Sequence, residues 1–213
     1  MKTSDLIRVL TAGAAPVKRA SAGRLLVFGA AAGALAALAL LALWLGLQPL
    51  APAMHERWFW MKAGYGAALA VAGGLLLLRL ARPGARLGWA AVAIGGVAAA
   101  VMCGMSVMDM ARASPAHRLD LWLGSSWDLC PLRITALSAP VFVGLLLALR
   151  SLAPTQLVLT GAAAGLTAGA LAACVYGLYC EETAAPFVAT WYTLGIGTCA
   201  LLGALVGRRA LRW

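Results

Sequence analysis

Six long stretches of apolar residues, separated by short polar segments, make up most of the chain. They cover residues 24–47, 58–80, 87–108, 132–149, 155–179 and 186–206. Most reach the roughly 20 residues that a helix needs to cross the hydrocarbon core of a membrane. Ala, Leu, Val and Gly run through them without the period-2 alternation of membrane β-barrel strands. The pattern therefore predicts an all-α integral membrane protein, a bundle of six transmembrane helices.

The segments outside these stretches are short, which limits the chain to one membrane domain. The longest are residues 1–23 and 109–131, and neither is long enough to bury its own core. The first stretch has an apolar core of about 22 residues, longer than that of a secretory signal peptide, so we expect it to persist as a helix. We expect three regions: a cytoplasmic tail with a short amphipathic helix (1–23), a six-helix transmembrane domain (24–207) and a basic cytoplasmic C-terminus (208–213).

Basic residues indicate how this bundle is oriented. Of the 17 Lys and Arg residues, twelve fall at the chain ends and in the turns after the second and fourth stretches. Six of the seven carboxylates lie on the opposite face. Because cytoplasmic loops carry an excess of Lys and Arg, both termini are predicted to be cytoplasmic. The net charge of +10 is then a topological signal that also attracts anionic lipid, and no basic soluble domain for nucleic acid is present.

Few side chains are suited to catalysis or transport. The apolar stretches hold almost no ionisable residue away from their ends, whereas transporters and proton pumps usually place such groups at mid-depth. The two histidines, His55 and His117, lie in outer loops without a nucleophile motif. The five cysteines contain no Cys-x-x-Cys motif. This weakens the case for a quinone-coupled thiol oxidoreductase, which would normally contain one. We therefore expect no enzymatic activity.

Two of the five cysteines differ from the others in position. Cys103, Cys174 and Cys199 fall inside apolar stretches, where a cysteine packs as a small apolar residue. Cys130 and Cys180 lie at the outer ends of the fourth and fifth stretches, which a short turn makes antiparallel neighbours. Counted from that turn along straight helices, their depths differ by ~7 Å. Cys174 is closer to level with Cys130 and is therefore a competing partner.

The surroundings of Cys130 and Cys180 suggest different roles. Pro131 suits the first position of a helix, which makes Cys130 the cap residue at the positive helix end, where a thiolate is favoured. We therefore expect Cys130 to react first and Cys180 to resolve the intermediate as a disulfide. A transient divalent metal is an alternative, as is a permanent structural disulfide. The possible metal ligands are Cys130, Cys180, Glu181, Glu182 and Asp128.

Small residues repeat at helical spacing in three of the stretches. The motifs are Gly29-x-x-x-Gly33, Gly161-x-x-x-Gly165-x-x-x-Gly169 and Gly203-x-x-x-Gly207. Each places glycines on one helical face, where two backbones can approach closely. Packing within the chain is the favoured interpretation, and an oligomer through these faces is the alternative.

Several short motifs, taken in order, resemble the NrsF family of bacterial inner-membrane anti-sigma factors, which restrain an extracytoplasmic-function sigma factor of the F type. They include the N-terminal Met-Lys-Thr-Ser-Asp-Leu-Ile, Gly-Ser-Ser-Trp-Asp-Leu-Cys at 124–130, Tyr176-x-x-x-Cys180, Pro186-Phe187 and the terminal Leu-Arg-Trp. The similarity covers essentially the whole chain. It implies that Cys130 and Cys180 are the signal-sensing residues, and that heavy-metal or oxidative stress acts through them to free the sigma factor.

The N-terminal tail contains a candidate partner-binding helix from Thr3 to about residue 12. Its apolar side chains fall on one helical face, with two charged residues off that face. The face can lie on the inner leaflet or enter a groove on a partner. The lipid interpretation is favoured by the residues alone, and sigma-factor binding once the resemblance is included. The candidate contact residues are Asp5, Leu6, Ile7, Arg8 and Leu10.

These observations together predict a non-enzymatic signalling protein, a membrane anti-sigma factor that responds through its outer cysteines. Two other classes stay open. Turnover of a dithiol substrate with quinone would indicate a thiol oxidoreductase, and transport into vesicles would indicate a metal or small-molecule exporter.

Overall fold

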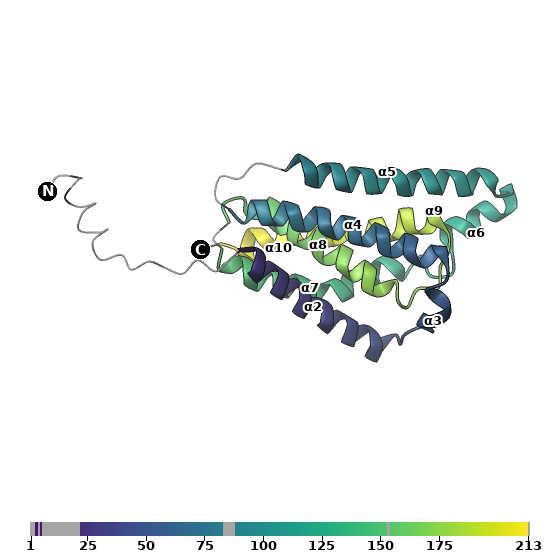
Figure 1. The fold of residues 1–213 in the computed structure, drawn as a ribbon, viewed down its shortest axis with the longest axis horizontal. Coiled ribbons are helices and arrows are strands. Elements are labelled where there is room, and N and C mark those ends of the chain that lie inside the picture. Colours follow the sequence, from purple (N-terminus) through teal and green to yellow (C-terminus); the bar gives the residue numbers. More distant parts are fainter. Residues whose placement is uncertain (1–2, 4, 6–21, 83–87, 153, 213) are drawn as a thin grey trace.

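The computed structural model describes residues 3, 5, 22–82, 88–152 and 154–212, and these form helices and turns without a β-strand (Figure 1). Six helical segments in this part of the chain are long and apolar enough to cross a membrane. This confirms the predicted all-α class and its six spanning-length helices. The segments are α2 (Ala22–Trp44), α4 (Arg57–Leu80), α5 (Trp89–Arg112), α7 (Cys130–Arg150), α8 (Leu157–Tyr176) and the continuous segment Ala185–Ala210.

The last segment contains three consecutive elements. A short α9 (Ala185–Phe187) leads into a π-helical turn, η2 (Val188–Tyr192), and then into α10 (Thr193–Ala210). A π-helical turn inserts an extra residue into the helical ladder and often occurs at functional sites. It rotates the residues before it relative to α10, and it contains Tyr192, which is completely buried.

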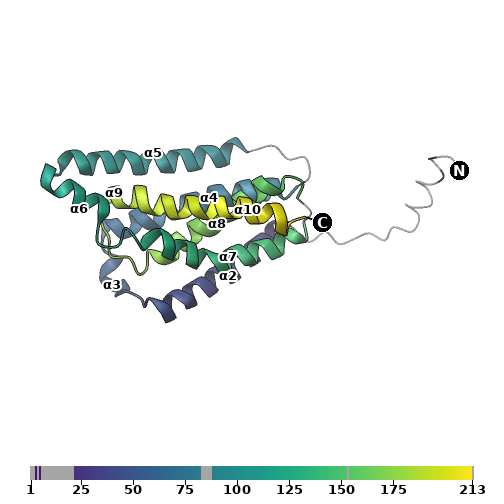
Figure 2. The same cartoon turned by 180° about the vertical axis from the view of Figure 1, so that it is seen from behind.

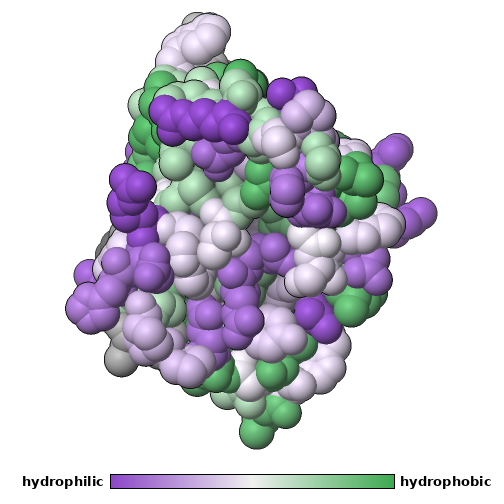
Figure 3. Space-filling model, turned by 90° about the vertical axis from the view of Figure 1, so that its right-hand side faces the viewer, coloured by the Kyte–Doolittle hydropathy of each residue, from purple (hydrophilic) through white to green (hydrophobic). Residues whose placement is uncertain are grey.

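The two ends of the bundle differ in character. Helix α2 begins and α10 ends at one end, here called the terminal end (Figures 1 and 2). The other end, the cysteine end, holds the start of α7 and the end of α8. It also carries three short elements: α3 (Leu50–Ala53), the 3₁₀ turn η1 (Pro115–His117) and α6 (Arg118–Leu123). Hydrophilic residues gather across this end, with hydrophobic ones mainly around its margin (Figure 3).

Three helices end at residues that differ from those predicted from the sequence. Helix α8 ends at Tyr176 instead of residue 179, because the next three residues form tight turns. The Cys180 amide still donates to the Tyr176 carbonyl at 3.0 Å, an i→i−4 bond that keeps Cys180 close to the end of α8. Helix α5 continues to Arg112, so the predicted outer segment starts four residues later than residue 109. Helix α2 ends at Trp44, before Gly46 with φ +86°.

Helix α8 lies at the centre of the bundle and packs against α4, α7 and α10. Its glycine face meets the glycine face of α10. A Cβ atom built on Gly161 would lie 2.2 Å from the Gly203 carbonyl oxygen, so the backbones touch. Gly29 and Gly33 of α2 pack in the same way on α7, beside Gly144 and Val141. The glycine faces that could have formed an oligomer are therefore covered by helices of the same chain. This agrees with the favoured prediction, packing within the chain.

Buried side chains form two clusters, one toward each end. The cluster at the cysteine end includes Tyr65, Cys130, Tyr176, Cys180 and Tyr192. The cluster at the terminal end contains apolar residues of α2, α4, α7, α8 and the final turn. Helices α2, α4, α7 and α8 contribute to both clusters. Helix α5 is peripheral, with few buried residues.

Candidate functional site at the cysteine end

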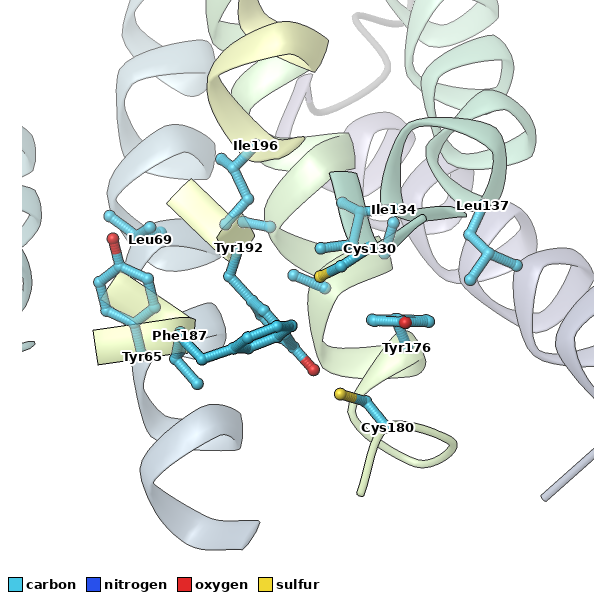
Figure 4. Close-up of a cluster of buried hydrophobic side chains, with 14 of the residues drawn as sticks. Tyr65, Leu69, Cys130, Ile134, Leu137, Tyr176, Cys180, Phe187, Tyr192 and Ile196 are labelled. Atoms are coloured by element: carbon cyan, nitrogen blue, oxygen red, sulfur yellow. The ribbon is translucent and has the colours of Figure 1, made fainter. Parts of the chain in front are cut away.

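Cys130 and Cys180 lie in one buried cluster although they are fifty positions apart in the chain. The exposed fraction of Cys130 is 0% and that of Cys180 is 2%. Both are free thiols. Figure 4 shows their sulfur atoms facing the same gap in the cluster, with the rings of Tyr176 and Tyr192 on either side. The two thiols thus share one cluster despite the difference in depth that straight helices predict.

The start of α7 differs by one residue from the prediction. Leu129 is the N-cap, and Cys130 is the first residue of the helix, with Pro131 second. The Cys130 amide donates to the Ser126 carbonyl at 2.9 Å, so this backbone group is satisfied by the preceding turn. Cys130 points into the bundle beside Ile134 (Figure 4). A reagent must therefore enter the cluster before it reaches this thiol.

Two buried tyrosines accompany the thiol pair. The ring centroids of Tyr176 and Tyr192 are 5.8 Å apart, and both side chains are 0% exposed. Neither hydroxyl group forms a hydrogen bond of normal geometry among the described residues; Tyr176 faces the Arg133 guanidinium group, and Tyr192 faces Cys180. A buried hydroxyl without a partner costs roughly 1–3 kcal/mol. The two tyrosines therefore place polar hydroxyl groups inside the cluster, beside the thiols (Figure 4).

Lys62 approaches the same cluster from α4. Its exposed fraction is 1%, and its Nζ atom donates to the Cys180 carbonyl oxygen. The ammonium group also lies 4.2 Å from the centroid of the Trp58 ring, in a cation–π contact. The residue therefore connects α4 directly to the backbone of Cys180.

A polar pocket opens beside Cys180 and has a volume of about 310 Å³. Cys180 lines it, together with the end of α8, the residues before α7 and the two following glutamates; Cys130 does not. Arg133 also lines this pocket and places its guanidinium carbon 5.4 Å from the centroid of the Tyr179 ring. Cys180 is therefore the thiol next to the pocket, and Cys130 lies behind it.

The carboxylates considered as metal ligands have separate surroundings. One oxygen of Glu182 accepts hydrogen bonds from the Ser125 amide and hydroxyl, both at 2.7 Å, and a longer one from the Ser126 hydroxyl. Glu181 and Asp128 are exposed. Among the described residues, no group of three His, Cys, Asp or Glu side chains is placed to hold a metal ion. Glu182 instead joins the loop before α7 to the loop after Cys180.

The other three cysteines lie elsewhere. Cys174 faces α4, where its sulfur is 3.8 Å from the Ala63 carbonyl oxygen and in contact with Gly66. Cys199 contacts the Ser138 hydroxyl at 3.3 Å on α7. Cys103 is exposed on α5. The structure thus brings Cys180, and not the competitor Cys174, to Cys130.

The predicted partner-binding residues in the tail fall mostly outside the described part of the chain. Asp5 is described and exposed. Leu6, Ile7, Arg8 and Leu10 lie outside the described residues, so the amphipathic tail helix stays a prediction.

Sequence reasoning missed Lys62, Tyr176 and Tyr192 as members of the site. Two signals pointed to them. Tyr176 precedes Cys180 by four residues, which is one helical turn, and Lys62 is a charge within an otherwise apolar stretch. Tyr192 stands in Trp191-Tyr192-x-Leu-Gly, another of the motifs that resemble the family, but the π-helical turn that directs its side chain has no clear mark in the sequence.

A family model described as NrsF, negative regulator of sigma F, matches residues 10–213. The chain belongs to the NrsF family. Over the whole of both chains it is 42% identical to the "Probable anti-sigma-F factor NrsF" of Azospira oryzae. It is 40% identical, again over the whole of both chains, to the "Anti-sigma-F factor NrsF" of Caulobacter vibrioides. No solved structure matches the chain. These relationships confirm the resemblance drawn from the motifs and identify this NrsF protein as a negative regulator of sigma F.

Proposed function

We propose that this protein spans the bacterial inner membrane and holds an extracytoplasmic-function sigma factor at its cytoplasmic, terminal end. It releases the sigma factor when Cys130 and Cys180 change state under heavy-metal or oxidative stress. The observation that carries the proposal is the convergence of two thiols, one at the start of α7 and one in the loop after α8, in one cluster beside a polar pocket. The protein acts by binding and release, without turnover of a substrate.

Disulfide formation is the change of state that the geometry favours. A peroxide that enters the pocket meets Cys180 first. The Cys180 sulfur attacks one peroxide oxygen, the O–O bond breaks, and a sulfenic acid and one water form. The Cys130 thiol then attacks that sulfur, an S–S bond forms, and a second water leaves. The two thiols lose two electrons to the peroxide. Because Cys180 lines the pocket, we expect it to react first. The positive charge at the helix end, taken alone, would favour Cys130 as the first thiol to react.

Metal binding is the second candidate, limited to ions that accept two sulfur ligands. Glu182 is already bound to Ser125, and among the described residues no third ligand group is in place. A closed tetrahedral zinc-type site needs four ligands, so it does not fit this arrangement. A soft ion held by two thiolates does, because thiolates select such ions.

The bundle offers a physical route from the cysteine end to the terminal end. Helices α2, α4, α7 and α8 contribute buried side chains to both clusters. Close packing resists gradual deformation, so a shift of the α8 end relative to α7 repacks the helices as units. We propose that this repacking alters the surface on which the sigma factor is held.

Serine variants test the sensor. Cys130→Ser and Cys180→Ser should each capture the sigma factor at the membrane but fail to release it after peroxide or cadmium, since one sulfur cannot form the bridge. Cys103→Ser is the matched control, because Cys103 is exposed on α5, and it should release normally. The measurement is the membrane-bound fraction of the sigma factor before and after stress. Normal release by both single serine variants would contradict the sensor.

Deletion of residues 2–12 tests the tail. Sigma-factor retention at the membrane should fall sharply, because the apolar face of the tail helix provides the contact. Replacing Asp5 and Arg8 alone, which lie off that face, should reduce retention less. Undiminished capture by the deletion variant would place the contact elsewhere on the terminal end.

A further inference from the structure

Four of the seven methionines lie where α4 packs on α5, toward the cysteine end of the bundle: Met61 on α4, and Met102, Met105 and Met108 on α5. Met105 and Met108 are three positions apart, so they are neighbours on one face of α5. Met102 is 4% exposed and packs in the buried cluster. Packing therefore accounts for Met102, and the other three remain to be explained.

The other three methionines, Met61, Met105 and Met108, line one cavity of about 460 Å³ between the start of α4 and the end of α5. The exposed fraction is 40% for Met105 and 51% for Met108, so neither side chain is held in the core. The remaining walls are mostly polar and come from Glu56, Arg57, Trp58, Asp109, Arg112 and Thr183. Because Glu56 and both arginines are exposed, the cavity reaches the hydrophilic surface of the cysteine end, where an ion can enter from water.

Thioether sulfur from three side chains in one cavity is a donor set for a soft monovalent cation. The sulfur atom of methionine is uncharged and polarisable, and soft ligands of this kind select ions such as Cu(I). Each methionine side chain has three rotatable bonds, so sulfur atoms from two helices can turn toward the same ion. The Asp109 carboxylate in the wall has another contact, because its Oδ2 atom accepts a hydrogen bond from the Ala185 amide at 3.3 Å. An apolar contact alone would be served as well by leucine, which has a similar volume.

We propose that Met61, Met105 and Met108 bind one soft monovalent cation, Cu(I) or Ag(I), through their three sulfur atoms. The site uses no thiol, so it goes beyond the proposed function and does not depend on the sensor pair. The cavity also borders the loop that follows Cys180, because Thr183 lines it. An ion bound by the three methionines therefore lies beside that loop.

The experiment follows the methionine methyl groups by NMR while silver nitrate is added. The full-length chain carries ¹³C at these methyl groups and is placed in lipid nanodiscs. Alanine replaces all five cysteines, so that silver cannot bind a thiol. Met61→Leu, Met105→Leu and Met108→Leu each remove one sulfur and keep an apolar side chain of similar volume. Met54→Leu is the matched control, because Met54 is 49% exposed at the same end of the bundle and does not line the cavity.

The methyl signals of Met61, Met105 and Met108 should shift together and saturate at one equivalent of silver. Each leucine substitution in the site should raise the silver concentration at half-saturation about tenfold or more, since changes even in the outer shell of a metal site weaken binding roughly 10–100-fold. Met54→Leu should leave that concentration unchanged. Zinc chloride should cause no saturating shift, because zinc binds thiolate, imidazole and carboxylate ligands.

Three results would overturn the site: no saturating shift with silver, shifts with a different midpoint for each methionine, or a half-saturation point that the leucine substitutions leave unchanged. A saturating shift of the same signals with zinc would do so too. The titration of the protein with all seven methionines tests the site even if a leucine variant fails to fold. Neither a cysteine nor the sigma factor is present, so a failure here leaves the thiol sensor standing, and a failure of the serine variants leaves this site standing.

Discussion

One oxygen atom of Glu182 holds the loop before α7 against the loop that follows Cys180. It accepts two hydrogen bonds from Ser125 at 2.7 Å and a longer one from Ser126. Gly124 has φ +58°, and a Cβ atom there would lie 2.6 Å from the other Glu182 oxygen. Ser125, Ser126 and Glu182 line the pocket at Cys180, so at the scale of single residues we expect them to set access to the thiol.

Replacing Glu182 by glutamine should loosen this part of the pocket. The amide lacks the charge that strengthens the bonds from Ser125, and the loss is roughly 1 kcal/mol or more. Cys180 alkylation at neutral pH should accelerate several-fold, as followed by mass spectrometry. The control is Glu181→Gln, which removes the neighbouring exposed carboxylate and should change the rate little. Equal rates in the two variants would show that Glu182 does not close the loop.

Gly124→Ala should destabilise the same part of the pocket. Its positive φ is unfavourable for alanine, and the added methyl group meets Glu182 and Phe187. We expect a loss of about 1–3 kcal/mol in unfolding free energy, together with faster Cys180 alkylation. Gly64→Ala on α4 is the control, because its Cβ meets open space and should not weaken the fold. Thermal unfolding in detergent measures both.

At the scale of elements, the contact between α8 and α10 organises the centre of the bundle. Glycines on both helices let the backbones touch, and α8 then presents its other faces to α4 and α7. The tight turn after Tyr176 sets where α8 ends, and the π-helical turn before α10 sets where Tyr192 points. The position of the thiol pair therefore depends on how these helices end and pack, not on the cysteines alone.

Gly161→Ala tests this interface. Its Cβ would lie 2.2 Å from the Gly203 carbonyl oxygen, so the helices must separate. Overpacking of this kind costs about 1–3 kcal/mol and should lower the unfolding midpoint in detergent. Gly197→Ala on α10 is the matched control: its Cβ is in open space, and alanine should stabilise the helix by up to about 1 kcal/mol. A higher midpoint for Gly161→Ala would contradict the close packing.

At the scale of the whole molecule, the two ends have separate tasks in the proposed function. The cysteine end receives the signal, and the terminal end, where α2 begins and α10 ends, holds the partner (Figures 1 and 2). An even number of spanning helices places both chain ends on one side of a membrane. The excess of Lys and Arg toward the terminal end then predicts that side to be the cytoplasm.

Single cysteines introduced into a cysteine-free protein test this orientation. Asp128→Cys at the cysteine end should react with a membrane-impermeant maleimide added to intact spheroplasts. Arg212→Cys at the terminal end should react only after the membrane is opened. Both positions are exposed, so a difference reports the side of the membrane. The reverse labelling pattern would overturn the orientation and the proposed direction of signalling.

The candidate site was predictable from the sequence in part. The positions of Cys130 and Cys180 at the ends of adjacent apolar stretches indicated the pair. Their burial was not predictable, because it depends on a loop that folds back over the helix end. The same loop directs Glu182 to Ser125 and away from a metal site. Lys62 was visible as a charge, but its contact with Cys180 joins residues 118 positions apart.

The sequence by itself determined the class of the protein, its six spanning-length helices and its family. These follow from the length of the apolar stretches and the order of short motifs, which are local properties. The tertiary structure alone decided that Cys180 lies at the pocket and Cys130 behind it. It also decided that Cys174 faces α4, and that Lys62, Tyr176 and Tyr192 complete the cluster. The physical reason is that these contacts join distant segments through tight turns and close helix packing, which no local pattern specifies.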